Sequence, residues 1–361
     1  MPKHIAMRIA GLLAVSLVLA GAAAGAPPTA ASPCNAAGAT TADLWPLHAQ
    51  PRRTRPHRPA AVHAGAAHAK HATTTKKATA AAPNDPLWSE EWGPRAVGLP
   101  SVWASAGATR KVVVAVVDTG VDATQRDLSG VVLPGWNVLT GTADAADDNG
   151  HGTAVAGVIA ARAGNAIGVA GYCRNCTILP VKVLDSNGHG PSTTIAAGID
   201  WAVDHGANVV NLSLTLTSRD GAVSAAVARA LAAGVIVVAA AGNTGGTGAA
   251  YPAAEPGVVS VEADDQSGAL YPWSTSGDWI TVAAPGCNQS TARGGGFGEF
   301  CGTSSAAAAV SGIIGTALGR AGATPARVEQ LLPAGIDAGI RRLDARTLVA
   351  ALAAATSEPG S

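Results

Sequence analysis

Short apolar runs that alternate with stretches of helical spacing constrain the fold of this chain more than any other feature. Lys111–Val117 (KVVVAVV) is apolar after its lysine and ends at Asp118. Such a run indicates a strand buried on both faces, because a strand with one wet face alternates polar and apolar residues. Further strands are expected at Thr177–Leu184, Ala207–Leu214, Val235–Ala241 and Val258–Val261, and helices at Thr153–Ala163, Ser192–His205, Ala222–Ala233, Ser305–Leu318 and Pro325–Leu331. The alternation predicts right-handed βαβ units and a mostly parallel sheet covered by helices on both faces.

Composition agrees with a tightly packed α/β protein. The chain has 44 glycines and only 13 % charged residues. Its formal net charge is zero, so no global field recruits nucleic acid or an acidic membrane. We expect neither as a partner.

The first 26 residues have the pattern of a secretory signal peptide. Lys3, His4 and Arg8 precede the apolar run Ile9–Ala20, and small residues follow as far as Ala26. A bilayer-spanning helix needs about 20 apolar residues, which this run does not supply. We expect export with cleavage, a secreted protein (extracellular or periplasmic) and no integral membrane segment afterwards.

Residues 27–83 differ in composition from the rest. They carry seven Lys or Arg and five His against one acid, Asp43, and have no sustained apolar period. Such a segment cannot bury enough surface to fold alone, so we expect a disordered basic pro-region or linker. The folded domain is expected at 84–355, with a C-terminal tail at 356–361.

Five cysteines suit an oxidising compartment. Cys173 and Cys176 form C-x-x-C, and no second such pair or nearby His completes a zinc site. Cys287 and Cys301 bracket what reads as a loop. Two local disulfides, 173–176 and 287–301, are the favoured prediction and unpaired thiols the alternative, with Cys34 left over.

Four polar residues stand where predicted strands end or predicted helices start. These are Asp118, His151, Asn243 and Ser304. Singly, each has an ordinary structural explanation, namely a turn, a cap, a turn pair and a helix N-cap. Together they supply an acid, a base, an amide donor and a nucleophile, which is what hydroxyl-mediated peptide hydrolysis needs. In a parallel sheet such positions meet at one edge.

The chain order Asp, His, Ser further restricts the class of hydrolase. It differs from the chymotrypsin and α/β-hydrolase orders, and no G-x-S-x-G elbow surrounds Ser304. The stretches DTGVD, HGT, AAAGN and GTSSA resemble the motifs of the subtilase family of serine peptidases, and NDPLW, ILPVKVLD and VAAPG extend the likeness to the thermitase-like branch over most of 84–355.

The resemblance implies a three-layer α/β/α fold around a mostly parallel, seven-stranded sheet, and endopeptidase activity on unfolded or extended polypeptides. It places the acid at Asp118, the base at His151, the nucleophile at Ser304 and the oxyanion donor at Asn243. The segments expected to flank an extended substrate are Gly188, His189 and Gly190 on one side, and Ser213, Leu214 and Thr215 with Gly242 on the other.

The chain departs from the family pattern in several places. Thr215 stands where glycine is usual, which predicts a narrower pocket and a preference for small or medium apolar side chains. Ser305 replaces the usual Met after the nucleophile, and Ala308 replaces a proline. Residues 27–83 also contain too few apolar residues to form the inhibitory pro-domain that exported subtilases commonly carry.

Structural calcium (Ca²⁺) is the cofactor that the resemblance implies. Hard oxygen ligands suit this cation. The expected ligands are side chains of Asp85, Asp127 and Asn165 and the main-chain carbonyls of Arg162, Ile167 and Val169. The competing interpretation is a loop that binds no metal.

Three functions are compatible with these residues. The favoured one is an exported serine endopeptidase, acting as a monomer on polypeptide substrates. A dedicated precursor-processing peptidase or transpeptidase uses the same chemistry. An inactive envelope-associated scaffold is disfavoured because all four site residues are present.

Overall fold

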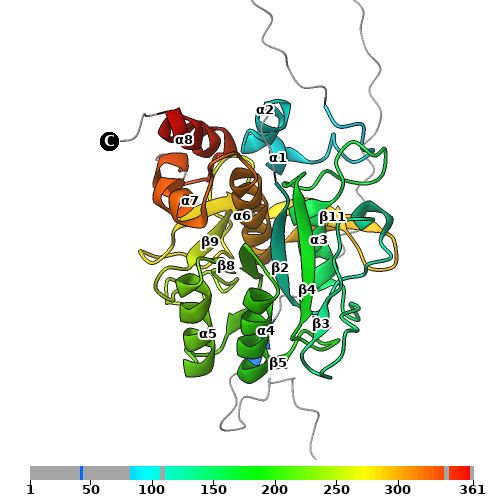
Figure 1. Cartoon of the computed structure of the whole chain (residues 1–361), viewed down its shortest axis with the longest axis vertical. Coiled ribbons are helices and arrows are strands. Elements are labelled where there is room, and N and C mark those ends of the chain that lie inside the picture. Colours follow the sequence, from blue (N-terminus) through cyan, green and yellow to red (C-terminus); the bar gives the residue numbers. More distant parts are fainter. Residues whose placement is uncertain (1–40, 44–81, 106–109, 337–340, 358–361) are drawn as a thin grey trace, which may run out of the picture. The chain divides into compact units, whose positions relative to one another are not determined.

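A parallel sheet of seven strands organises the chain in the computed structural model, which describes residues 41–43, 82–105, 110–336 and 341–357. The strand order is β10-β9-β8-β6-β2-β4-β3, and every neighbouring pair is parallel. Figure 1 shows β2, β4, β8 and β9 of this sheet in the middle of the domain. The strands are β2 (Val112–Asp118), β3 (Trp136–Asn137), β4 (Cys176–Lys182), β6 (Val209–Leu212), β8 (Ile236–Ala240), β9 (Val259–Asp264) and β10 (Val282–Pro285). The predicted parallel sheet is therefore confirmed, although β3 and β10, which lie at its two ends, were not among the strands expected from the residues.

Helices cover both faces of this sheet, as predicted. On one face α3 (His151–Ala160) and α6 (Thr303–Leu318) pack into the larger core, and on the other α4 (Ser192–Asp204) and α5 (Gly221–Ala232) pack into a second core. The remaining helices are α1 (Trp92–Ala96), α2 (Leu99–Ala104), η1 (Arg126–Leu128), α7 (Pro325–Leu331), η2 (Leu332–Gly335) and α8 (Ala345–Ser357). The three-layer α/β/α architecture follows.

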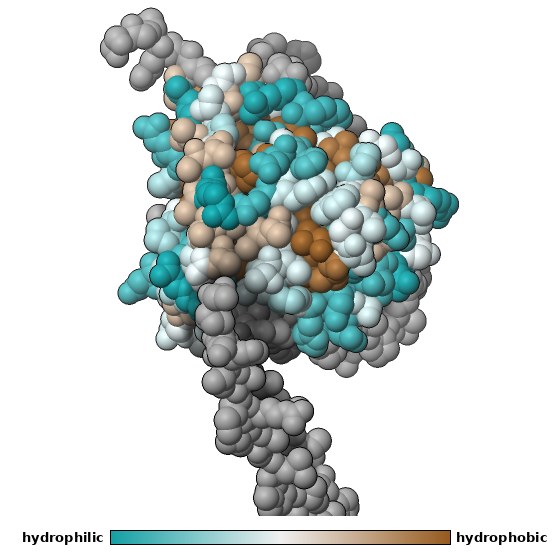
Figure 2. Space-filling model, turned by 60° about the horizontal axis from the view of Figure 1, so that its bottom comes forward, coloured by the Kyte–Doolittle hydropathy of each residue, from teal (hydrophilic) through white to brown (hydrophobic). Residues whose placement is uncertain are grey.

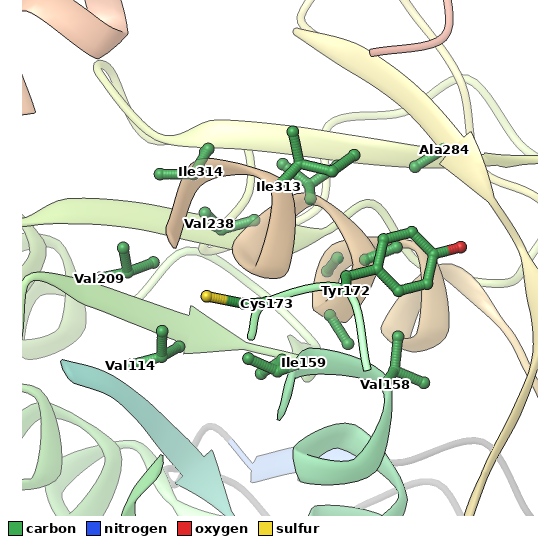
Figure 3. Close-up of a cluster of buried hydrophobic side chains, with 14 of the residues drawn as sticks. Val114, Val158, Ile159, Tyr172, Cys173, Val209, Val238, Ala284, Ile313 and Ile314 are labelled. Atoms are coloured by element: carbon green, nitrogen blue, oxygen red, sulfur yellow. The ribbon is translucent and has the colours of Figure 1, made fainter. Parts of the chain in front are cut away.

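Helix α6 lies in the middle of the larger core and is buried along its whole length. Figure 3 shows Ile313 and Ile314 of this helix among side chains from the sheet, next to Tyr172 and Cys173. Glycines let the helix approach this closely, because a Cβ on Gly312 would stand 2.5 Å from Tyr172 Cβ, and one on Gly315 2.3 Å from Cys176 Sγ. The abundance of small residues is thus a packing requirement.

The boundaries of two helices differ from the prediction in a way that matters for the site. Helices α3 and α6 each begin two residues earlier than expected, so His151 and Ser304 lie in the first helical turn. The N-cap interpretation of Ser304 is wrong, since the N-cap is Gly302 at φ 135°. Periodicity did not reveal the early start because these turns consist of Gly, His, Thr and Ser.

Two smaller sheets were not predicted. Between Cys287 and Cys301, where a loop was expected, β11 (Cys287–Thr291) and β12 (Phe297–Cys301) form an antiparallel hairpin. The glycine-rich, polar sequence there lacks the alternation that indicates strands. The second sheet has the order β5-β1-β7 and contains β5 (Gly190–Pro191), β7 (Thr215–Leu216) and β1 (Thr41–Asp43). No element was expected at 41–43.

Both predicted disulfides, Cys173–Cys176 and Cys287–Cys301, are present. The predicted signal peptide, Cys34, most of 27–83 and the tail from 358 lie outside the described residues. Within the described part of the chain, no helix is long and apolar enough to cross a membrane.

Candidate active site

The four predicted site residues come from elements that end or begin at one edge of the sheet. Asp118 is the last residue of β2, Asn243 follows β8, and His151 and Ser304 open α3 and α6. Figure 2 brings forward the end of the molecule that carries β3 and β5, and shows apolar side chains surfacing there between polar ones. Ligand sites of parallel sheets form at the carboxyl edge for this topological reason.

Asp118 and His151 form a buried pair. His151 Nδ1 lies 2.9 Å from Asp118 Oδ1 and 3.0 Å from Oδ2, and the two residues are 0 % and 1 % exposed. The Phe300 ring packs edge-on against the imidazole with 5.2 Å between centroids. The opposite ring nitrogen, Nε2, is buried and has no hydrogen-bond partner in the described structure. The carboxylate and Phe300 therefore set the ring's orientation and leave Nε2 open.

A second carboxylate, Asp147, ties the histidine turn to the end of β2. It accepts hydrogen bonds from the main-chain N–H groups of Asn149, Gly150 and Thr153 at 3.0, 2.8 and 3.0 Å. It also accepts from the Thr119 hydroxyl at 2.9 Å, and that hydroxyl in turn accepts from Gly152 N–H at 3.0 Å. Asp147 is 6 % exposed. Sequence analysis missed this residue, although an Asp before a helix N-terminus is a recognised signal.

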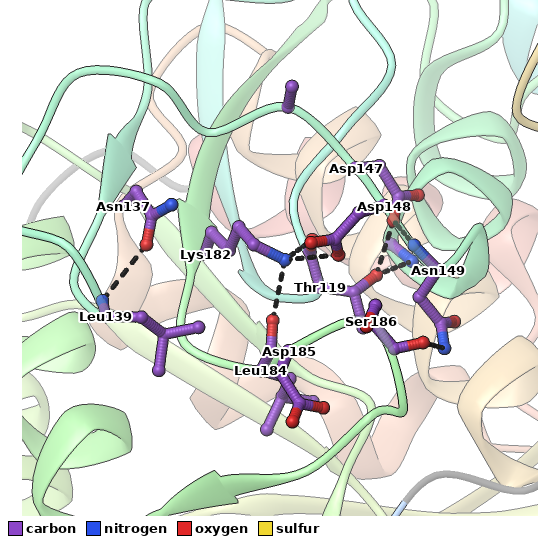
Figure 4. Close-up of polar contacts among 12 residues, drawn as sticks. Thr119, Asn137, Leu139, Asp147, Asp148, Asn149, Lys182, Leu184, Asp185 and Ser186 are labelled. Carbon is purple, nitrogen blue, oxygen red and sulfur yellow. Dashed lines mark hydrogen bonds and ion pairs between the residues drawn. The ribbon is translucent and has the colours of Figure 1, made fainter.

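Buried Lys182 binds the main chain directly after Asp118. Its Nζ donates to the carbonyl oxygens of Thr119 at 2.7 Å and Leu184 at 2.8 Å, and to Asp148 Oδ1 at 2.6 Å (Figure 4). Two main-chain carbonyls and one carboxylate thus satisfy the three protons of the ammonium group. The lysine joins the ends of β2 and β4 to the loop before His151.

Ser304 bonds reciprocally with the segment after β6. Its Oγ donates to the Ser213 carbonyl at 3.0 Å, and Ser213 Oγ donates to the Ser304 carbonyl at 2.9 Å. The hydroxyl in this structure therefore engages Ser213 and leaves His151 Nε2 without it. Ser304 is 6 % exposed.

Asn243 is held by Thr303. Asn243 Oδ1 accepts from Thr303 N–H at 2.9 Å and from Thr303 Oγ1 at 3.1 Å, which directs the NH₂ group away from Thr303. Thr303 Oγ1 also accepts from Gly242 N–H at 3.0 Å. Sequence analysis missed Thr303, although it stands in the quoted motif GTSSA.

The Asn243 amide and the main-chain nitrogen of Ser304 lie close to Gly302. An ideal Cβ on that glycine would lie 3.6 Å from Asn243 Nδ2, 3.7 Å from Asn243 Oδ1 and 3.7 Å from the main-chain nitrogen of Ser304. Because Thr303 engages Oδ1, the Nδ2 group and the Ser304 nitrogen are the donors available here. A side chain would fill this space, and Gly302 leaves it open to a groove also lined by Gly150, Trp273 and Phe300. The arrangement suits a developing negative charge.

The predicted cleft segments lie on two strands with a third strand between them. Gly190 belongs to β5 and Thr215 to β7, with Gly188 and His189 leading into β5 and Ser213 and Leu214 into β7. Thr215 Cγ2 lies 3.5 Å from the position a Cβ on Gly242 would take. The threonine methyl group therefore occupies space beside Gly242 that a glycine at 215 would leave empty.

All six predicted calcium-ligand residues meet in one hydrogen-bonded cluster. Asp85 accepts from the N–H groups of Gly164 and Asn165, and Asp127 accepts from Asn165 Nδ2 at 2.8 Å and Val169 N–H at 2.9 Å. Arg162 N–H donates to the Asp127 carbonyl, and Ile167 N–H donates to Asn165 Oδ1. Among the described residues, no group of three or more His, Cys, Asp or Glu side chains is gathered to hold a metal.

The cluster concentrates negative charge. Burial and, secondarily, nearby Asp85 raise the pKa of Asp127. Burial, with Asp85 and Asp127 adding to it, raises the pKa of neighbouring Glu91 to about 8. A cation among these carboxylates would relieve the repulsion.

A buried Asp–His pair and a helix-borne serine, at one edge of a parallel sheet covered by helices on both faces, are the groups that a serine hydrolase with an α/β/α fold uses. The model of the subtilase family matches residues 109–343, and the chain belongs to this family. It is a subtilisin-like serine peptidase.

Similar proteins include thermitase from Thermoactinomyces vulgaris, 40 % identical over 64 % of this chain and 84 % of thermitase. The thermophilic serine proteinase of Bacillus sp. strain AK1 is 40 % identical over 64 % of this chain and 58 % of its own length. Among solved structures, fervidolysin from Fervidobacterium pennivorans, described as a keratinolytic enzyme related to subtilisin, has a TM-score of 0.68 at 30 % identity, covering 76 % of this chain and 47 % of its own.

Proposed function

We propose that this peptidase is an exported endopeptidase that cleaves extended polypeptides through a covalent acyl-enzyme. The buried hydrogen bond between Asp118 and His151 Nδ1, with Nε2 left open, is the observation that carries the proposal. A base of this kind accepts a proton only if its other nitrogen is held as a donor, which the carboxylate ensures.

The reaction begins with a rotation of the Ser304 side chain. Its hydroxyl exchanges the Ser213 carbonyl for His151 Nε2, and a rotation between staggered rotamers is sufficient for this. Ser304 Oγ then attacks the carbonyl carbon of the substrate while Nε2 takes the proton. Asp118 stabilises the resulting imidazolium, which returns the proton to the leaving amine. Water attacks the acyl-enzyme in the same way and releases the new carboxylate.

The oxyanion formed in each step is assigned to the space beside Gly302. Asn243 Nδ2 and the Ser304 main-chain nitrogen are the donors nearest to it, and Asn243 Oδ1 is already engaged by Thr303. Both are held before the reaction, Asn243 through its two bonds to Thr303 and the main-chain nitrogen by its place in α6. Donors that need no reorganisation stabilise the transition state more than the substrate.

Main-chain pairing is expected to hold the substrate. An extended peptide between β5 and β7 gains hydrogen bonds that do not depend on side-chain identity. Thr215 beside Gly242 supports a preference for small or medium apolar residues before the scissile bond.

Export and calcium binding belong to the same proposal. The charged and apolar stretches before Ala26 and the two disulfides support an oxidising extracytoplasmic location. The carboxylates of Asp85 and Asp127 and the Asn165 amide lie in one negatively charged cluster, and such hard oxygen ligands suit Ca²⁺, which would stabilise the fold without entering the chemistry.

Casein hydrolysis by the purified protein tests this function. Wild type should degrade casein, whereas Ser304→Ala should lose activity by a factor of at least about 10³ and melt at an unchanged temperature. Retained activity in Ser304→Ala would overturn the assignment of the nucleophile. A wild-type enzyme that leaves casein intact would contradict a broad endopeptidase.

A further inference from the structure

One hairpin contacts both helices that carry the reacting side chains. Strands β11 and β12 pair antiparallel, with Asn288 directly opposite Phe300. Directly opposite residues lie on the same face of an antiparallel pair, and these two are buried, at 5 % and 3 % exposure. Phe300 packs against the His151 ring, and Asn288 bonds to Ser305, the residue after the nucleophile. One face of the hairpin therefore contacts both the base and the neighbour of the nucleophile.

The contact with Ser305 belongs to a buried network around Asn288. Asn288 Nδ2 donates to Ser305 Oγ at 2.9 Å and to the Pro285 carbonyl at 2.8 Å. Asn288 Oδ1 accepts from the Tyr172 hydroxyl at 2.6 Å. Because a main-chain carbonyl can only accept, the amide nitrogen must face Pro285 and Ser305. Partners on both sides thus hold the Asn288 amide in one orientation.

Two hydroxyl groups further along β11 hold the helix of the base. Ser290 Oγ donates to the Ala154 carbonyl at 2.6 Å, and Thr291 Oγ1 donates to the Thr153 carbonyl at 2.8 Å. Gly157 permits this approach, because a Cβ there would stand 2.2 Å from Thr291 Oγ1 and 2.4 Å from Ser290 Oγ. Figure 1 shows β11 beside α3. The hairpin is therefore fixed to α3 independently of its contact with α6.

We propose that the hairpin β11–β12 sets the position of the nucleophile relative to the base, and that Asn288 is the positioning residue that acts on Ser304 through Ser305. This inference rests on the roles proposed for His151 and Ser304. The covalent link from β12 to α6 passes through Gly302 at φ 135°, and glycine has the widest backbone freedom of any residue. A side-chain bond from the hairpin therefore adds a constraint that the main chain alone does not supply.

Ser305 stands where subtilases usually have methionine. A thioether sulfur is only a weak hydrogen-bond acceptor, whereas the Ser305 hydroxyl accepts from Asn288 Nδ2 at ordinary hydrogen-bond distance. The serine thus supplies the acceptor that a buried amide at position 288 requires.

Removal of the Ser305 hydroxyl tests the positioning role. In Ser305→Ala the Asn288 amide loses one acceptor and keeps the Pro285 carbonyl. We expect kcat for a short chromogenic peptide to fall about 2- to 12-fold, the factor that one net hydrogen bond of ordinary strength corresponds to. KM should stay unchanged, because the segments assigned to substrate pairing are not altered.

Ser260→Ala is the matched control. Ser260 is a fully buried serine of β9 whose hydroxyl donates to the Trp279 carbonyl at 2.8 Å and accepts from Thr281 N–H at 2.8 Å. Its loss should lower the melting temperature at least as much as Ser305→Ala does, and should leave kcat at the wild-type value. Wild-type kcat in Ser305→Ala, or an equal loss of kcat in both variants, would overturn the proposal.

A double-mutant cycle tests whether the network acts through Ser305. Tyr172→Phe removes the hydroxyl that orients the Asn288 amide but keeps the buried ring, so the variant should fold. It should lower kcat about 2-fold in the wild-type background and have no further effect on kcat in the Ser305→Ala background, because the bond that it supports is already absent there. Independent, multiplicative losses would contradict transmission through Ser305.

Sulfonylation of the nucleophile separates this inference from the proposed function. Ser304 Oγ would attack the sulfur of phenylmethanesulfonyl fluoride, form a sulfonate ester and displace fluoride, while His151 Nε2 takes the hydroxyl proton. Wild type and Ser260→Ala should be modified at Ser304 at equal rates, and Ser305→Ala about 2- to 12-fold more slowly. Equal rates in all three would overturn the positioning role and leave the proposed function intact. A wild type that is not modified at Ser304 would contradict the proposed function and, with it, this inference.

Discussion

The Thr303 hydroxyl accepts a hydrogen bond from Gly242 N–H and donates one to Asn243 Oδ1. Removing this hydroxyl should therefore affect both the stability of the fold and the activity, and the two effects can be measured separately. In Thr303→Val the shape of the buried side chain is kept, but Oγ1 and both of its hydrogen bonds are lost. Asn243 Oδ1 then retains only the bond from residue 303 N–H. The Gly242 N–H becomes a buried donor without a partner.

The two losses have different magnitudes and different observables. A net hydrogen bond contributes about 0.5–1.5 kcal/mol, so weaker positioning of Asn243 should lower kcat about 2- to 12-fold with little change in KM. An orphaned buried N–H costs about 1–3 kcal/mol, which lowers the melting temperature of a domain of this size by about 2–12 °C. In subtilisin itself, removal of the oxyanion asparagine is known to lower kcat about 10²–10³-fold. Thr303→Val should therefore lose less activity than Asn243→Ala.

Peptide kinetics and calorimetry on the same preparations measure both effects. Thr303→Ser keeps the hydroxyl and is the matched control, so it should resemble wild type in kcat. Wild-type kcat in Thr303→Val would refute the role assigned to the hydroxyl. A Thr303→Ser variant as impaired as Thr303→Val would place the effect in the methyl group instead.

Three further predictions follow from other parts of the structure. Thr215→Gly removes the methyl group beside Gly242. It should raise the ratio of kcat/KM for peptides with Phe before the scissile bond to kcat/KM for peptides with Ala there by about 10-fold or more, whereas Thr215→Val should leave this ratio unchanged. A peptide library in which Thr215→Gly shows no shift would refute the narrowing of the pocket by Thr215. Calcium at 100 times its dissociation constant should stabilise the fold by about 2.7 kcal/mol and raise the melting temperature. Asp127→Asn should abolish this rise in melting temperature, and a chelator should reverse it in wild type. A melting temperature of wild type that does not depend on calcium would exclude the site. Burial raises the pKa of Asp264 from 3.8 to about 6 despite its bond to Arg342. This residue therefore contributes stability of the order of 3 kcal/mol below about pH 4, and this contribution is lost as the pH rises through about 6. Asp264→Asn should flatten the pH dependence of the free energy of unfolding measured in urea, and the same pH dependence in variant and wild type would contradict the raised pKa.

Much of the fold and of the site's chemistry was predictable from local pattern. The run that ends at Asp118 has the composition of a strand buried on both faces, and the structure places it as β2 in the interior of the sheet. Asp118, His151, Asn243 and Ser304 stand at element ends, and the carboxyl edge of a parallel sheet brings such ends together. The C-x-x-C spacing likewise sufficed for the Cys173–Cys176 disulfide.

Only the tertiary structure decided how those residues are held. Thr303, Asp147 and Lys182 act through hydrogen bonds to residues that are distant in the sequence, and no periodicity reveals such partners. The Ser304 hydroxyl bonds to Ser213, a contact across 91 positions. Helices α3 and α6 start earlier than predicted because tertiary packing, rather than helix propensity, favours their first turns.

The segment at 41–43 shows most clearly how tertiary contacts can decide a structure that the local sequence pattern does not predict. Its composition offers no hydrophobic period, so the sequence alone predicts no structure there. A strand nevertheless forms because β5 and β7 present two edges, and main-chain pairing depends little on side chains. Sequence by itself determined the parallel sheet in its five central strands, the order of the reactive groups and the family, but not the edge strands β3 and β10. The packed fold decided their orientation and which segment lies between the edges of the cleft, because both depend on contacts between residues far apart in the chain.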